Sequence, residues 1–288
     1  MFILYTFLIS LGINLLFFIF AYTFKSDKFT DITYSLSFIL IALILMIWNQ
    51  AYSWFQISIF IITTLWAIRL GSYLLIRIMK TKVDHRFDNM RDHFWKFLGF
   101  WLLQATSVFL IIIPAAFCFS YNNDYFNEFN YYSMIPLAIA LLGLIYETVA
   151  DIQKYKFKNK YPKDFINIGL WKQSRHPNYF GEIIFWYSVC TAIILNMLLN
   201  VSNQSITNTN DLLWTLSLFL SPLYIQMLLI FLSGVPLLEK STYKKYGSSK
   251  DYENYVKHTS CVIPYFGKKG HILIVKNKIK IIDDIKNK

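Results

Sequence analysis

The sequence predicts an all-α membrane protein with seven transmembrane helices, and three observations support this fold class. Of the 288 residues, 56% are hydrophobic and 16% are charged, whereas a soluble domain carries about 25% charged residues. The hydrophobic residues form long runs, each close to the ~20 residues that a helix needs to cross a ~30 Å hydrocarbon core. The loops between these runs are alternately basic and free of Lys and Arg, which is typical of chains that cross a membrane repeatedly.

The predicted spans follow one another along most of the chain. The first has no basic residue before it and exceeds the roughly 7–15 residues of a signal-peptide core, so we interpret it as a retained helix. The fifth ends in ETVADIQKY, where charge density rises, and the sixth follows Pro177, which discourages helix in the residue before it. In chain order, the predicted spans cover residues 2–24, 32–48, 54–78, 95–119, 133–151, 180–201 and 211–234.

The distribution of basic residues predicts the orientation. The loops at 49–53, 120–132 and 202–210 contain no Lys or Arg. Nearly all of the 28 basic residues lie in the other loops and in the tail after residue 235. Because basic loops stay in the cytosol, we expect the amino terminus outside or in the lumen and the carboxyl terminus in the cytosol. The membrane would be the endoplasmic reticulum in a eukaryote and the inner membrane in a bacterium.

The chain shows no internal repeat, and residues 1–266 are interpreted as one domain. Residues 267–288 form a basic, alternately apolar tail, interpreted as an arm near the anionic leaflet surface or as a disordered segment. The net charge of +11 does not indicate a nucleic-acid partner, because no zinc spacing or basic patch with interleaved aromatic residues is present. The cysteines Cys118, Cys190 and Cys261 share no metal or redox spacing, so no metal is predicted.

The stretch 169–182, GLWKQSRHPNYFGE, concentrates polar chemistry between two apolar spans. Charges beside hydrocarbon cost roughly 2.5–3.5 kcal/mol each on insertion scales, so such a cluster is a functional-site hypothesis. A basic turn that leads into a helix amino terminus suits a phosphate, because free backbone N–H groups point at it. The alternative is an ordinary basic cytosolic loop, which we adopt for Lys154, Lys156, Lys158 and Lys160. The candidate residues of the turn are Lys172, Arg175, His176, Asn178, Tyr179 and Glu182.

Two other groups of residues accompany this turn. Glu147 and Asp151 are four residues apart and therefore share one helix face, where they suit ribose or amide hydrogen bonding. After the last span, polar and phenolic residues recur at near-helical spacing, so this segment predicts either an interfacial aromatic belt or a lid over the turn. The members of the second group are Glu239, Tyr243, Tyr246, Tyr252 and Tyr255.

The third span carries Arg69 and Arg77, with Tyr73 one turn from each. Arg77 is alternatively a side chain that extends to the cytosolic surface. Weaker candidates are Gln104, Asp84, His85 and Arg86, and the histidines His85, His93, His258 and His271 are interpreted as solvated loop residues.

These motifs resemble the steroid 5-alpha-reductase C-terminal superfamily, most closely its DUF1295 branch. The resemblance rests on SRHPNYFGE with the upstream GLW, on WAIRLGSYLLIR followed by DHRFD, and on LLQ, ETVADIQKYKF, SGVPLLEK and the terminal IPYF. It covers roughly residues 48–266. Isoprenylcysteine carboxyl methyltransferases and sterol reductases carry similar RHPNY-type turns.

The resemblance implies an NADPH-dependent reductase of a carbon–carbon double bond in a lipid, with a cytosolic segment folded over a cofactor pocket. It implies that Glu147, Asp151 and the turn residues bind the nucleotide, that Arg69 lies near the nicotinamide, and that Tyr73 donates a hydrogen bond to the substrate carbonyl. It also implies that the closing segment contributes Glu239, Tyr243 and Tyr255. No glutamate occurs in the first three spans, which departs from the steroid reductases.

Two alternatives stay open. One is an S-adenosylmethionine-dependent methyltransferase of lipids or isoprenylcysteine, which would use the same turn to hold its cofactor. The other is a non-catalytic membrane scaffold or lipid-binding protein of the same fold. The sequence predicts a lipid partner in either case, and it leaves the lipid and the oligomeric state open.

Overall fold

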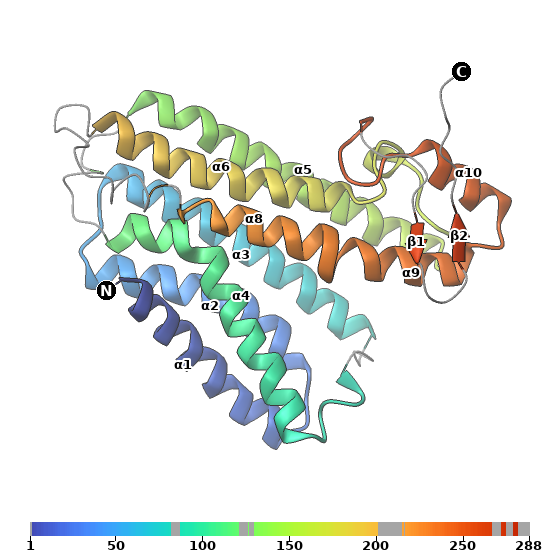
Figure 1. The fold of residues 1–288 in the computed structure, drawn as a ribbon, viewed down its shortest axis with the longest axis horizontal. Coiled ribbons are helices and arrows are strands. Elements are labelled where there is room, and N and C mark those ends of the chain that lie inside the picture. Colours follow the sequence, from blue (N-terminus) through green and yellow to red (C-terminus); the bar gives the residue numbers. More distant parts are fainter. Residues whose placement is uncertain are drawn as a thin grey trace. The chain divides into compact units, whose positions relative to one another are not determined.

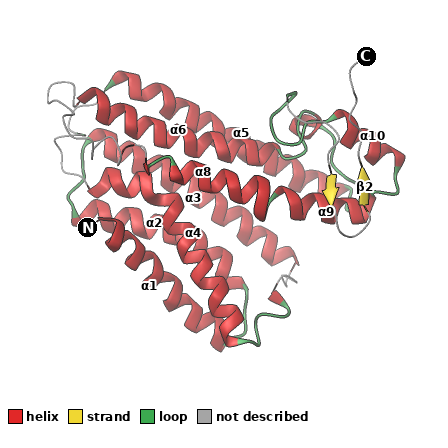
Figure 2. Cartoon of the chain, viewed as in Figure 1, coloured by secondary structure: helices red, strands yellow, loops and turns green. Residues whose placement is uncertain are grey.

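The computed structural model confirms the predicted fold class (Figure 1, Figure 2). Its described residues contain seven helices that are long and apolar enough to cross a membrane. The structure describes residues 2–81, 87–120, 126, 130–200, 215, 217–266, 272–274 and 279–281.

The predicted spans agree with the observed helices to within about one turn, except for the fifth and seventh. The fifth continues to Lys160, since its charged end is helical as well. For the seventh, residues 211–214 and 216 lie outside the described part, and the helix starts at Leu220. The first six membrane helices are α1 (Phe2–Thr23), α2 (Lys28–Trp48), α3 (Trp54–Thr81), α4 (Phe94–Ser120), α5 (Met134–Lys160) and α6 (Pro177–Asn200). The seventh comprises α8 (Leu220–Met227), a π-helical turn (Leu228–Leu232) and α9 (Val235–Tyr246).

The chain divides into two compact units. Unit 1 consists of Met1–Ala140 and Trp186–Tyr224, and unit 2 consists of Leu141–Phe185 and Ile225–Lys288. The single domain predicted for residues 1–266 stays a prediction.

Aromatic side chains form the core of unit 1. In one cluster Phe18 of α1 packs against Phe97 and Trp101 of α4, with ring centroids 5.9 and 6.4 Å away. In another, Trp66 of α3 meets Phe38 and Trp186 edge to face, at 5.0 and 4.9 Å. Edge-to-face pairs add about 0.5–1.5 kcal/mol beyond their area burial, so these contacts hold α1 to α4 and α3 to α2.

Hydrogen bonds between polar side chains also join the helices of unit 1. The Gln104 side-chain amide of α4 donates to Asn14 Oδ1 of α1 at 3.0 Å and to the Thr30 carbonyl of α2 at 3.2 Å. Such bonds stabilise helix contacts inside a bilayer by roughly 0.6 kcal/mol each. Gln104, a weak candidate for the site, therefore links α1, α2 and α4.

Arg77 does not simply extend to the surface, because its guanidinium lies 3.0 Å from the carboxylate of Asp31 on α2. A second ion pair joins Arg91 to Asp27 at 3.3 Å. Both pairs tie α2 to the end of α3 or to the segment that follows it. The candidates Asp84, His85 and Arg86 lie outside the described residues.

In unit 2, α5 and α6 lie side by side (Figure 1) and approach closely at two glycines. A β-carbon on Gly181 would lie 2.8 Å from the Gly143 carbonyl oxygen and 2.8 Å from Glu147 Cβ. Only a residue without a side chain fits such a contact, as in many membrane helix pairs. The close approach places the first turns of α6 directly against the polar half of α5.

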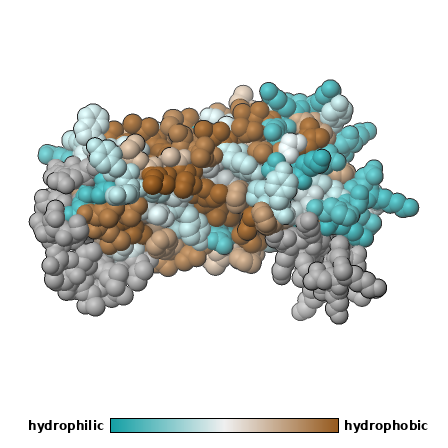
Figure 3. All heavy atoms as spheres, turned by 90° about the horizontal axis from the view of Figure 1, so that it is seen from above, coloured by the Kyte–Doolittle hydropathy of each residue, from teal (hydrophilic) through white to brown (hydrophobic). Residues whose placement is uncertain are grey.

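The last membrane helix is interrupted near its middle. The π-helical turn Leu228–Leu232 is followed by Ser233 and Gly234, after which α9 begins with Pro236 in its first turn. The short helix α10 (Lys250–His258) follows. Hydrophilic side chains gather at the end of unit 2 that carries α9 and α10, whereas hydrophobic side chains cover the helices beside it (Figure 3).

The carboxyl-terminal tail contains two short strands, β1 (Ile272–Ile274) and β2 (Ile279–Ile281), which pair antiparallel with Ile272 opposite Ile281. The sequence analysis predicted either an arm near the membrane surface or a disordered segment for residues 267–288, and neither alternative included this hairpin. The alternation of apolar and polar residues is the pattern of a strand. The rest of the tail lies outside the described residues.

Candidate functional site

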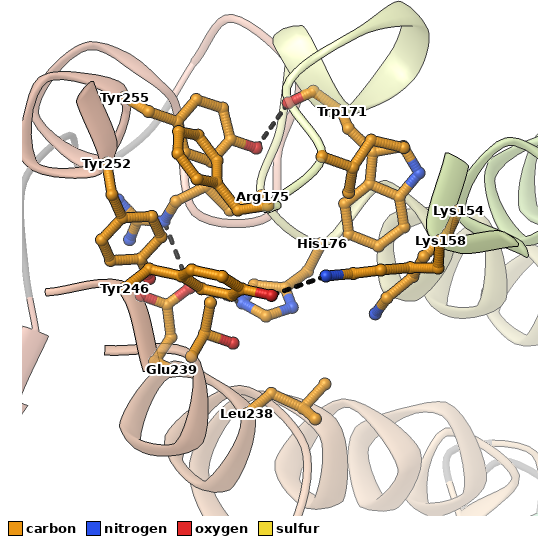
Figure 4. Close-up of a pocket in the computed structure, with 13 residues that line it drawn as sticks. Lys154, Lys158, Trp171, Arg175, His176, Leu238, Glu239, Tyr246, Tyr252 and Tyr255 are labelled. Atoms are coloured by element: carbon orange, nitrogen blue, oxygen red, sulfur yellow. Dashed lines mark hydrogen bonds and ion pairs between the residues drawn. The ribbon is translucent and has the colours of Figure 1, made fainter. Parts of the chain in front are cut away.

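Three segments of unit 2 meet at one polar cluster (Figure 4). They are the turn before α6, the middle of α9, and the chain after α10. Each contributes at least one buried charged or polar side chain, so the cluster is described segment by segment.

The turn before α6 is attached firmly to α5. The Leu170 N–H donates to Gln153 Oε1 at 2.9 Å, and the Trp171 indole N–H donates to the Ala150 carbonyl at 2.9 Å. Gly169 has a φ of +58°, and a β-carbon there would lie 2.5 Å from Gln153 Oε1. The left-handed backbone favours glycine here, and a β-carbon would also displace the Gln153 side chain that accepts from Leu170. These bonds fix the position from which Arg175 and His176 extend.

The chain after α10 docks onto this turn through its backbone. The N–H groups of Arg175 and His176 donate to the carbonyls of Ser260 at 2.9 Å and Cys261 at 3.0 Å. Ser174 Oγ donates to the Val262 carbonyl at 2.7 Å. The segment after the last span therefore folds onto the turn, and its role as a lid over a ligand stays a prediction.

Arg175 belongs to this docking as well as to the cluster. Its Nη1 donates at 2.8 Å to the carbonyl of Val256, in the last turn of α10. A guanidinium at a helix carboxyl terminus satisfies carbonyls that lack intrahelical partners and matches the dipole of the helix. The sequence motif predicted a ligand-binding cation at this position, whereas the structure shows that part of its hydrogen-bonding capacity is used within the protein.

The centre of the cluster is a carboxylate between two nitrogen groups. Glu239 Oε1 lies 2.7 Å from His176 Nε2 and 3.2 Å from Arg175 Nε. The three residues are only 4–7% exposed. Since a carboxylate accepts hydrogen bonds and has no proton to give, Nε2 of a neutral His176 carries the proton and donates.

Burial lowers the pKa of His176 below its usual 6.5, and the hydrogen bond to Glu239 opposes this shift only in part. The imidazole is therefore neutral at neutral pH, with Nδ1 as an acceptor. Among the described residues, Nδ1 of His176, Nη2 of Arg175 and Oε2 of Glu239 are buried without a hydrogen-bond partner. Such atoms cost about 1–3 kcal/mol each when they stay unsatisfied, so the cluster favours a bound polar group or water.

A cavity of about 100 Å³ adjoins the cluster (Figure 4). One side presents two ammonium groups from α5, with Lys154 Nζ 4.6 Å from the Trp171 ring centroid and Lys158 Nζ 2.7 Å from the Tyr246 hydroxyl. The cavity has room for a phosphate or a single ring, and it is smaller than the 300–1,000 Å³ of typical ligand pockets. The remaining lining is mainly aromatic and apolar, from Phe165, Ile166, Leu238, Thr242, Tyr252 and Tyr255.

The four lysines that were interpreted as ordinary loop charge lie on a helix, and Lys154 and Lys158 differ from the other two in position. Both lie on α5 and line the cavity, whereas Lys156 and Lys160 are exposed. The signal was present in the sequence, because residues 147, 151, 154 and 158 follow the spacing of one helix face. The loop assigned to residues 152–179 concealed it, since the helix continues to Lys160.

The structure separates Lys172 from the other cations of the turn. Lys172 lines an open groove of about 710 Å³ together with Asp164, Asp251 and His258, whereas Arg175 and His176 line the small cavity. The two hollows share only aromatic walls, formed by Phe165, Tyr246 and Tyr255. The sequence analysis placed Lys172 and Arg175 in one phosphate site, whereas in the structure they line two neighbouring hollows.

The other predicted residues have the following positions. Glu147 and Asp151 are buried on α5, at 2% and 5% exposure, and Glu147 lies against Gly181. Tyr243 packs against the hydrophobic cluster of Tyr252 and Val256. Arg69 and Tyr73 are half-buried on α3 and belong to unit 1. Half-buried residues in the first two turns of α6 are Asn178, Tyr179 and Glu182, and the His176 ring stacks on Tyr179 at 5.4 Å.

The structure also brings Cys261 to the cluster, where its Sγ and single ligand atoms of His176 and Glu239 lie within 4.8 Å of one another. Sequence spacing gave no hint of this group, because its members lie in three separate segments. Burial raises the pKa of the Cys261 thiol, which disfavours the thiolate that metals bind. The guanidinium of Arg175 beside Glu239 further opposes a cation, so the chemistry of this cluster suits a polar or anionic group.

The family comparison confirms the DUF1295 branch of the resemblance noted in the sequence. A family described as "Protein of unknown function (DUF1295)" matches residues 17–259. No curated protein and no solved structure matches the chain. Because the match covers most of the chain, the protein belongs to the DUF1295 family.

Proposed function

We propose that the protein is a membrane-embedded, NADPH-dependent reductase of a carbon–carbon double bond in a lipid. The observation that supports it most is the buried group of Arg175, His176 and Glu239 beside a cavity lined by Lys154 and Lys158. Three cationic side chains at one small cavity favour a bound anion. The same group offers the carboxylate Oε2 of Glu239 to a donor, which suits a ligand that carries both phosphate and hydroxyl or amide groups.

The residues at the cavity fit part of such a cofactor. A hollow of about 100 Å³ holds one phosphate or ring, so the rest of a dinucleotide would need other residues. Glu147, Asp151, Asn178 and Glu182 are the candidates for these further contacts. The unsatisfied Nη2 of Arg175 would donate to an anionic oxygen, and the aromatic walls would exclude water and strengthen that bond.

We also propose that the site faces the cytosol. The basic end of α5 and the docked segment after α10 lie in unit 2 beside the apolar lengths of α5 and α6. Basic residues remain on the cytosolic side, and NADPH is a cytosolic metabolite. The carboxyl terminus would then be cytosolic too.

For the chemical step, we assign the donor role to Tyr73 and a positioning role to Arg69. Bound NADPH would supply a hydride for the β-carbon of a conjugated carbonyl, so negative charge would develop on the carbonyl oxygen until the α-carbon takes up a proton from solvent. The Tyr73 hydroxyl would donate a hydrogen bond to that oxygen. One such donor stabilises the transition state by about 2.7–4 kcal/mol. An apolar substrate could enter from the bilayer, which excludes water from the reaction.

Ligand-induced stabilisation of the purified protein tests this proposal. A ligand that binds only the folded state raises the stability by about 2.7 kcal/mol at a hundred times its dissociation constant. We expect NADPH to raise the melting temperature more than NADH does, and S-adenosylmethionine to have no effect. Stabilisation by S-adenosylmethionine instead would indicate a methyltransferase, and no effect of any of them would contradict a nucleotide-dependent enzyme.

A further inference from the structure

The segment Val262–Phe266, which contains the IPYF motif, exposes three large apolar side chains in succession. Ile263, Tyr265 and Phe266 are 52%, 66% and 74% exposed, whereas Val262 is 9% exposed and faces inward. Exposed apolar side chains that lie together can mark an interaction site. The reductase proposal assigns these residues no task.

Hydrogen bonds hold this segment in place, so its exposed side chains have a defined direction. Ser174 Oγ donates to the Val262 carbonyl at 2.7 Å, and the Tyr265 N–H donates to the Gln173 carbonyl at 3.1 Å. Tyr265 has a φ of +60°, a left-handed conformation that costs roughly 1–2 kcal/mol for a residue other than glycine. In this conformation the Tyr265 and Phe266 side chains are exposed.

The segment lies next to two membrane helices of the same unit. Gln173 and Ser174, to which the segment is hydrogen-bonded, immediately precede α6, and the same turn is bonded to α5 through Leu170 and Trp171. On α5, a stripe of exposed apolar side chains runs toward the polar end of the helix. These residues are Leu142, Ile145, Val149 and Ile152, with 39–64% exposure. Their spacing follows one helix face, and a lipid-facing surface is what covers such a stripe in a membrane span.

We propose that Ile263, Tyr265 and Phe266 insert into the interfacial region of the bilayer and anchor the docked carboxyl-terminal segment there. The segment is bonded to the turn that joins α5 and α6, and these helices expose apolar side chains to lipid, so we commit the patch to lipid rather than to a protein partner. Tyrosine suits this depth, because its ring is apolar and its hydroxyl reaches water. The anchor would hold Ser260 and Cys261 against the turn, where their carbonyls accept hydrogen bonds from the N–H groups of Arg175 and His176.

Spin labels measure the depth directly. The full-length variants Phe266→Cys and Ile263→Cys, reconstituted in phosphatidylcholine nanodiscs, would be labelled with a nitroxide and compared with Asn254→Cys on exposed α10. The two anchor positions should collide severalfold more with oxygen, relative to a water-soluble nickel chelate, than position 254 does. The parent protein, labelled in parallel, gives the background from Cys261. Equal aqueous accessibility at all three positions would overturn the proposal.

A second measurement tests whether insertion holds the segment. The double variant Ile263→Ser, Phe266→Ser should alkylate severalfold faster at Cys261 in nanodiscs than the parent does, because the released segment exposes the thiol. The substitutions remove exposed side chains, so folding should be retained, and circular dichroism checks it. An unchanged alkylation rate would contradict the anchoring role. Neither measurement depends on NADPH binding, so both would still test the anchor if the reductase proposal failed.

Discussion

His176 Nε2 and Glu239 Oε1 lie 2.7 Å apart although the two residues are 63 positions apart in the chain. This contact joins the turn before α6 to α9, the last part of the seventh membrane helix. Because Arg175 shares the same oxygen at 3.2 Å, the contact also connects to the carboxyl end of α10. One buried carboxylate therefore links all three segments of the site.

Glu239→Gln should destabilise unit 2. The substitution leaves the Arg175 guanidinium buried without its counter-charge, and breaking a buried pair in this way costs about 3–5 kcal/mol. We expect a lower melting temperature, measured by circular dichroism in detergent. Glu253→Gln on α10, a half-buried glutamate outside the cluster, serves as the matched control. Equal melting temperatures for the two variants would show that the Glu239 carboxylate does not stabilise the fold.

The lowered pKa of His176 predicts a pH dependence of stability. The unfolded chain binds a proton at His176 near pH 6.5, but the folded protein binds it only at lower pH. As the pH falls between these two values, the unfolded state therefore takes up more protons, and folding loses free energy. We expect the melting temperature to fall below about pH 6.5, with a smaller fall in His176→Gln. Identical pH profiles for the two proteins would contradict a neutral, buried His176.

Gly181→Ala should disrupt the contact between α5 and α6. The added β-carbon would lie 2.8 Å from both the Gly143 carbonyl oxygen and Glu147 Cβ, and overpacking of this kind costs about 1–3 kcal/mol. Gly99→Ala on α4 is the control, because a β-carbon there would meet no atom within 4 Å. Thermal unfolding of both variants measures the difference. Comparable stability of the two would mean that the helices separate easily at Gly181.

The membrane helices were predictable because their apolar runs and their lengths are local properties of the sequence. The signature turn was predictable for the same reason, and the structure brings Arg175, His176 and Glu239 together as a single group. Lys154 and Lys158 were missed because a helix that leaves the membrane keeps its periodicity while its hydropathy falls. The boundary of a hydrophobic run therefore does not mark the end of the helix.

Other features of the site depend on tertiary contacts that local patterns do not encode. Cys261 reaches the cluster only because backbone bonds dock its segment onto the turn. Lys172 and Arg175 are three residues apart, yet they line different hollows, since Arg175 turns inward to the carbonyl of Val256. The direction of a side chain in an irregular turn follows from its partners, and these lie far away in the sequence.

Lys154→Ala should weaken NADPH binding if the cavity holds a phosphate. Loss of one cation should raise the dissociation constant roughly tenfold, which corresponds to about 1.4 kcal/mol. The matched control is Lys156→Ala, which removes the same charge from an exposed position of the same helix. Fluorescence titration of the bound nucleotide compares the two. Equal weakening in both variants would indicate a general effect of charge rather than a contact at the cavity.

Tyr73→Phe should separate catalysis from binding. The substitution removes only the hydroxyl proposed to donate to the substrate carbonyl, so turnover should fall by up to roughly 10²–10³ while the affinity for NADPH stays the same. The control is Tyr34→Phe on α2, a half-buried tyrosine of the same unit that packs on Phe38. Oxidation of NADPH with an enone lipid, followed by the loss of nicotinamide absorbance, gives the turnover, and nucleotide titration gives the affinity. Because phenylalanine preserves the ring and its packing, a loss of turnover without loss of affinity would place the hydroxyl in the transition state. Full turnover in Tyr73→Phe would remove Tyr73 from the mechanism.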